Sequence, residues 1–170
     1  MRPLLPVLTL LAASAVAGDL TFYVGTSGAA AQGILRGTLD AETGKLSDPV
    51  VIAPAKGASF LALGQDGKVL YATAEVAGGG VAAYRLSAEG KATYLNGQDT
   101  KGKGATHVSV DQTGKFLFAA NYGSGSVACL PLQADGSIGP ASSFFQQEGS
   151  GPNKARQTGP HAHGIYPDAA

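Results

Sequence analysis

Two histidines near the end of the chain are the strongest candidates for chemistry. His161 and His163 lie in the motif Gly159-Pro160-His161-Ala162-His163. On an extended strand, residues two apart project to the same side. An imidazole can shuttle protons near neutral pH, and a pair can bind a metal. The alternative is that one ring packs against the loop while the other faces a pocket. Because H-x-H is a weak metal signal by itself, we predict no metal site.

The segment before these histidines, residues 148–160, is long, polar and rich in glycine. Loops of this kind that interrupt a series of tight hairpins commonly line a pocket. Arg156 lies in it, and a planar guanidinium pairs well with a carboxylate or a phosphate. We therefore predict a pocket in which Arg156 contacts substrate, with an ordinary surface arginine as an equally good interpretation.

Three further residues are placed by an internal repeat of about 47 residues. Glu75 follows the apolar segment 69–74, and Tyr122, which is 47 residues later, follows the segment 116–121. Both are expected at one shared rim, although position alone favours a solvated carboxylate for Glu75. His107 is 47 residues after Phe60 and is expected to be mostly buried, with a place near a central channel as the alternative.

The repeat itself predicts the fold. The stretch Ser59-Phe60-Leu61-Ala62-Leu63 is followed by an Asp-Gly turn and a second apolar segment, and residues 106–119 repeat this order. Residues 80–86 match 126–132 and 33–39 in the same way. Each unit holds about four strands, expected at 60–63, 69–74, 80–86 and 93–95 in the middle unit. A period of 40 to 50 residues with four antiparallel strands is typical of a β-propeller blade.

Composition narrows the class of protein. The chain has 12 basic and 12 acidic residues, so nothing indicates nucleic acid or an anionic membrane as a partner. Residues 1–17 have a basic start, an apolar run and an Ala-x-Ala end, as in a signal peptide. We expect the product to be exported, periplasmic or secreted, without a membrane span after cleavage. The single cysteine, Cys129, allows no internal disulfide, and we expect it to be a small buried strand residue.

The number of units is lower than a closed ring requires. Residues 18–170 hold about three blades, whereas propellers close with about four to eight. An open array would leave two apolar blade faces bare. We therefore expect this chain to be the N-terminal portion of a longer protein or a truncated gene product, inactive by itself.

The sequence resembles the seven-bladed β-propeller lactonases, which include propeller-type 6-phosphogluconolactonase and carboxymuconate lactonising enzyme. The resemblance rests on four segments spread along residues 18–170, which are residues 22–26, residues 60–63, Asn121-Tyr122-Gly123 and the motif around His161. It covers about three of seven blades.

The resemblance implies hydrolysis of a lactone ring without a metal or organic cofactor. It implies catalytic roles for His161, His163 and Glu75. Arg156, Tyr122, Asn121 and His107 would contact the substrate. Because sugar phosphates are cytosolic and an exported protein would rarely meet them, we expect an unphosphorylated lactone. A non-catalytic propeller that acts as a scaffold is the alternative, since propellers host many unrelated functions. The substrate, the direction of the reaction and the oligomeric state stay open.

Overall fold

The computed structural model describes residues 18–74 and 79–168, and this part of the chain consists of antiparallel β-sheets without a helix. The first sheet contains β1 (Leu20–Gly25), β2 (Ile34–Leu39) and β3 (Val50–Ala53). The second contains β4 (Leu61–Leu63), β5 (Val69–Ala74), β6 (Gly80–Leu86) and β7 (Ala92–Asp99). The third contains β8 (Ala105–Val110), β9 (Phe116–Asn121), β10 (Ser126–Pro131) and β11 (Ser143–Gln146).

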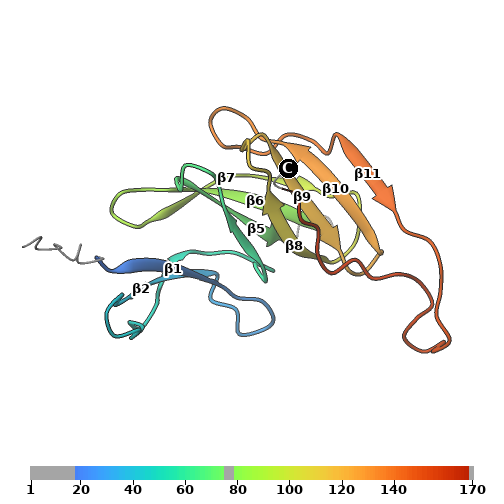
Figure 1. Cartoon of the computed structure of the whole chain (residues 1–170), viewed down its shortest axis with the longest axis horizontal. Helices are drawn as coiled ribbons and strands as arrows, with labels where there is room; N and C mark the ends of the chain where they lie inside the picture. The colour runs from blue at the N-terminus through green and yellow to red at the C-terminus, as the bar shows by residue number, and fades with distance from the viewer. Residues whose placement is uncertain (1–17, 75–78, 169–170) are drawn as a thin grey trace, which may run out of the picture.

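Each sheet is a meander in which consecutive strands pair (Figure 1). The expected all-β architecture of successive blades is confirmed, and β5, β6 and β9 have the predicted bounds. Two differences stand out: β7 is longer than the predicted strand at 93–95, and the first sheet has three strands where about four were expected. By the repeat, β1 corresponds to β5 and β9, so no described strand takes the place that β4 and β8 occupy in their sheets.

Tight turns between strands follow from glycine. Gly67 closes the β4–β5 turn with φ 67°, and Gly90 closes the β6–β7 turn with φ 81°. A residue with a Cβ is disfavoured in this left-handed region, so Asp66-Gly67 and Glu89-Gly90 end their strands where the sequence predicts.

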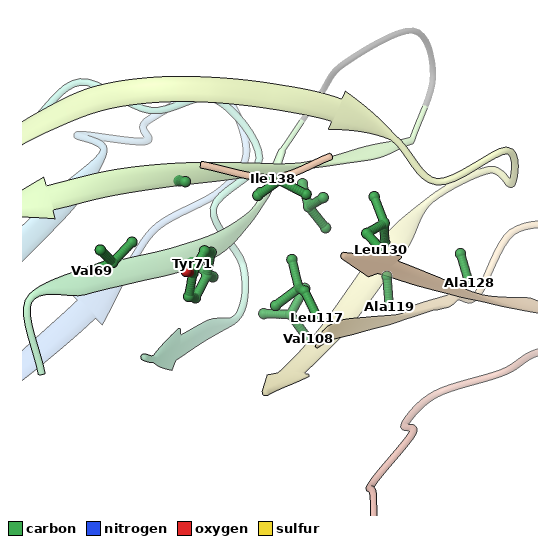
Figure 2. Packing of buried hydrophobic residues seen from close by; sticks show 10 residues of the cluster. Val69, Tyr71, Val108, Leu117, Ala119, Ala128, Leu130 and Ile138 are labelled. Carbon is green, nitrogen blue, oxygen red and sulfur yellow. The ribbon is translucent and has the colours of Figure 1, made fainter. Parts of the chain in front are cut away.

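The two central strands of the second sheet, β5 and β6, are buried on both faces. In β5, Val69 and Tyr71 pack toward the third sheet, whereas Leu70 and Ala72 pack toward the first. The same alternation continues in β6, which explains why both strands are almost continuously apolar. Figure 2 shows the core between the second and third sheets, where Leu117 and other side chains of the third sheet meet those of the second.

A side-chain amide reinforces this junction. Asn96 of β7 donates from Nδ2 to the carbonyl of Ile138 at 2.7 Å and accepts from the Ile138 N–H at 2.9 Å. Ile138 is itself buried in the shared core. The two sheets are therefore joined by apolar burial and by a paired polar contact.

Candidate functional site

The candidate site lies where β9 ends, around the exposed ring of Tyr122. The His161 ring stacks on it with centroids 4.4 Å apart and planes inclined by 15°. The His163 ring meets the same tyrosine edge-on at 5.8 Å. Both imidazoles therefore lie beside one side chain, and the expectation that they project to the same side is confirmed. We call Tyr122, His161 and His163 the histidine site.

Both ring nitrogens of His161 face backbone carbonyl oxygens. Nδ1 donates to the Tyr122 carbonyl at 2.8 Å, and Nε2 lies 3.2 Å from the Arg156 carbonyl. Both neighbours are acceptors, so a doubly protonated ring can make two hydrogen bonds and a neutral ring only one. His161 thus ties the loop after β11 to the turn after β9.

His163 differs from His161 in its polar contacts. Within residues 18–74 and 79–168, its ring nitrogens make no hydrogen bond, and the side chain is exposed. Ala162 between the two histidines is buried, so it holds the backbone while both imidazoles face outward. Of the two, His163 has the imidazole that is available for proton transfer to a ligand or water.

The long loop after β11 forms a cavity beside the site, as its composition predicts. The cavity has a volume of about 370 Å³ and is lined by residues 148–151 and by Gln157, Gly159, Pro160 and His161. Gln157 stabilises the loop because its Oε1 accepts from the Asn153 N–H at 3.0 Å and its carbonyl accepts from the Gly151 N–H at 2.9 Å. Only His161 belongs to both this cavity and the histidine site.

His107 is buried, as predicted, and only 2% of its surface is exposed. Its ring lies between Phe60 at 4.3 Å and Tyr166 at 4.5 Å. Burial lowers the pKa of His107 below its usual value of 6.5, and the nearby His163 lowers this pKa further. A charged imidazole is disfavoured in such a place, so His107 is neutral at pH 7.

This burial predicts a loss of stability in mild acid. The unfolded chain takes up a proton on His107 near pH 6.5, whereas the folded chain binds it only at a lower pH. The contribution of His107 is therefore complete above about pH 6.5 and is lost as pH falls below that value. Urea unfolding at about pH 7.5, 6.5 and 5.5 should show a smaller pH dependence for His107→Phe than for the wild type. Equal slopes would contradict this expectation.

The other predicted site residues are placed differently. Asn121 is fully buried; its Oδ1 accepts from Thr100 at 2.7 Å and its Nδ2 donates to Ser126 at 3.2 Å. Its amide thus supports the turn after β9 and is not exposed at the site. Arg156 is exposed and reaches the site through its carbonyl. Glu75 lies outside the described residues.

Gly125 controls how closely the histidine motif approaches this turn. Its φ is 66°, and a Cβ at this position would lie 2.2 Å from the Pro160 carbonyl oxygen. Gly125→Ala is therefore expected to strain the backbone and displace the residue next to His161, at a cost of about 1–3 kcal/mol. Denaturant unfolding measures this cost, and Gly28→Ala is the control, because Gly28 also has positive φ but open space. Equal losses for the two variants would show that the contact with Pro160 is unimportant.

Three residues around His107 were not predicted as part of the site. Phe60 and Tyr166 flank its ring, and Ser109 donates to the Ile165 carbonyl at 2.6 Å. The repeat places Phe60 and His107 in equivalent positions, and this could have identified Phe60 as a neighbour of the site. The contacts to Ile165 and Tyr166 join residues more than 50 positions apart, and no local sequence pattern predicts them.

Other features of the described residues bear on function. No three or more histidine, cysteine or acidic side chains gather there in a way that could hold a metal. No helix in the same ranges is long and apolar enough to cross a membrane. Cys129 is half-buried, not fully buried as expected, because it lies on the face of β10 opposite Ala128 and Leu130 of the core. Burial raises the pKa of its thiol, which disfavours the nucleophilic thiolate.

Comparison with known proteins relates this arrangement to a family. Residues 21–170 match the family model described as lactonase, 7-bladed beta-propeller. A 6-phosphogluconolactonase of Bacillus subtilis is 38% identical over 151 residues, which are 86% of this chain and 43% of that protein. One from Formosa agariphila is 34% identical over 62% of this chain and 31% of that protein.

Solved structures agree with the described fold. A protein from Lactobacillus plantarum has a TM-score of 0.72 and 28% identity, covering 80% of this chain and 40% of that one. The Pseudomonas aeruginosa periplasmic gluconolactonase, PpgL, has a TM-score of 0.69 and 27% identity, covering 76% and 39%. The chain thus spans less than half the length of each of these relatives.

Proposed function

The chain belongs to the seven-bladed β-propeller lactonase family, and from this premise we propose that it supplies the histidine side of a site that hydrolyses a lactone ring. The observation that carries the proposal is the imidazole of His163, which makes no hydrogen bond within residues 18–74 and 79–168 and lies beside Tyr122 and the anchored His161. Because the relatives are more than twice as long, the remaining part of such a site would come from sequence outside this chain.

In the proposed reaction, His163 acts as the general base. Its ring nitrogen takes a proton from water, the resulting hydroxide oxygen bonds to the lactone carbonyl carbon, and negative charge develops on the carbonyl oxygen. Collapse of this intermediate breaks the ring C–O bond, and the proton from His163 goes to the leaving alkoxide. The products are a carboxylic acid and a hydroxyl group. A base of this kind typically contributes about 10²–10⁴-fold to a rate.

The neighbouring residues have supporting roles in the proposal. His161 holds the loop and the Tyr122 turn together, so it positions the base and the substrate. The exposed Arg156 guanidinium is suited to stabilise the developing oxyanion or a substrate carboxylate. Glu75 would orient substrate hydroxyl groups. The mechanism requires no metal or organic cofactor.

We further propose that the substrate is an unphosphorylated lactone met outside the cytoplasm. Two observations support this. Residues 1–17 have the composition of a signal peptide, and PpgL, which is described as a periplasmic gluconolactonase, shares the fold at 27% identity. The relatives named 6-phosphogluconolactonase support a phosphorylated sugar lactone as the substrate instead. The turnover of the two kinds of lactone therefore has to be compared directly.

A chimera tests both proposals without depending on where this chain ends. Residues 21–170 replace the matching part of the Bacillus subtilis 6-phosphogluconolactonase, which supplies the part of its length that this chain does not cover. We expect the chimera to hydrolyse lactones, with a higher ratio of glucono-1,5-lactone to 6-phosphogluconolactone turnover than the parent. A folded chimera without activity would contradict the lactonase proposal, and an unchanged ratio would contradict the substrate proposal.

A further inference from the structure

The imidazole of His107 is not explained by packing alone. Phe60, its equivalent in the repeat, has an apolar ring that is 38% exposed, whereas only 2% of His107 is exposed. A buried imidazole has polar nitrogens, and burying a polar group is unfavourable unless it finds a hydrogen-bond partner. The third sheet therefore buries a polar ring, and the nitrogens of this ring need hydrogen-bond partners.

The Nδ1 atom of His107 accepts the backbone N–H of Ile165 at 3.4 Å. Ser109, two residues further along β8 and hence on the same side of the strand, donates to the Ile165 carbonyl at 2.6 Å. Both backbone polar groups of Ile165 are thus held by side chains of β8. The ring of the next residue, Tyr166, also packs against His107.

These contacts restrain the segment that carries His163. Its beginning is fixed at His161, whose ring is bonded to the carbonyl of Tyr122. Its end is fixed at Ile165 by His107 and Ser109. His163 lies between the two fixed points, so its backbone has little freedom to move relative to Tyr122.

We propose that His107 is a positioning residue that, with Ser109, holds Ile165 and thereby keeps the His163 imidazole beside Tyr122. This inference rests on the proposed role of His163 as the base. His107 acts through Ile165 and does not touch the substrate. An acceptor Nδ1 requires the neutral ring with its proton on Nε2, and the lowered pKa of His107 agrees with that form.

Two substitutions separate packing from hydrogen bonding. His107→Phe keeps a ring between Phe60 and Tyr166, and the repeat already places phenylalanine in the equivalent position, so the variant should fold. It removes the acceptor for Ile165. His107→Asn provides a side-chain oxygen near the place of Nδ1 and loses the ring. Thermal unfolding of both variants checks the fold before any other comparison.

The first measurement uses the 170-residue chain and does not need activity. Amide hydrogen exchange at Ile165 should be roughly tenfold faster in His107→Phe than in the wild type, as expected for the loss of one hydrogen bond. It should return toward the wild-type rate in His107→Asn. Proton NOEs between the rings of Tyr122 and His163 should weaken in His107→Phe alone. Unchanged exchange and NOEs in a folded His107→Phe would overturn the proposal.

The second measurement uses the Bacillus subtilis chimera. His107→Phe should lower kcat about tenfold while KM changes less than about twofold, and His107→Asn should recover part of kcat. Unchanged kcat in His107→Phe, even with faster exchange at Ile165, would overturn the positioning role. If the unsubstituted chimera hydrolyses no lactone, the proposed function fails, while the exchange and NOE measurements still decide whether His107 holds His163 in place.

Discussion

Replacing His163 with glutamine in the chimera is expected to lower kcat for lactone hydrolysis about 10²–10⁴-fold. Glutamine has a similar reach and can still form hydrogen bonds, but it cannot accept a proton near neutral pH. Because the His163 ring makes no hydrogen bond within residues 18–74 and 79–168, its loss should leave the fold and the substrate affinity nearly unchanged. Initial rates against lactone concentration separate kcat from KM.

His161→Gln is the matched control, since it makes the same chemical change two residues away. His161 bonds to the Tyr122 carbonyl and lies against the Arg156 carbonyl, so its replacement should lower thermal stability as well as rate. We expect a smaller loss of kcat than in His163→Gln. A larger loss in a fully folded His161→Gln would transfer the role of base to His161, and unchanged hydrolysis in both variants would eliminate a histidine base.

The second large effect concerns the packing between sheets. Leu117→Ala is expected to destabilise the protein by about 2–5 kcal/mol, because the deleted atoms leave a cavity in a fully buried place. Leu117 lies in the core shared by the second and third sheets (Figure 2). Whole domains are stable by only about 5–15 kcal/mol, so the loss is a large share of the total. Urea unfolding at pH 7.5 measures it.

Leu46→Ala is the control for this substitution. Leu46 has the same side chain but is 58% exposed, and its replacement should change the unfolding free energy by less than about 0.5 kcal/mol. Similar losses for both leucines would mean that the sheets are not stabilised by burial against one another. That result would also remove the physical basis for interpreting the repeats as stacked blades.

The sequence by itself determined the class of fold and the positions of several strands. Strand ends at Asp66-Gly67 and Glu89-Gly90 follow from the preference of glycine for positive φ, which depends on the turn alone. The bounds of β5, β6 and β9 follow from apolar segments that recur at nearly equal intervals. The same repeat predicts that His107 is buried from its equivalence to Phe60, although Phe60 itself is 38% exposed.

The tertiary structure alone decided which of the two histidine rings is hydrogen-bonded within the part of the chain that the structure describes. His161 and His163 are alike in type and local spacing, but Tyr122, 39 residues earlier, supplies a carbonyl to His161 only. The position of Asn121 was decided in the same way, since Thr100 and Ser126 engage its amide in the interior. The hydrogen bond from the Ile165 N–H to His107 joins residues that are 58 positions apart. Contacts of this range depend on how whole sheets pack, and a periodic pattern of neighbouring residues contains no information about them.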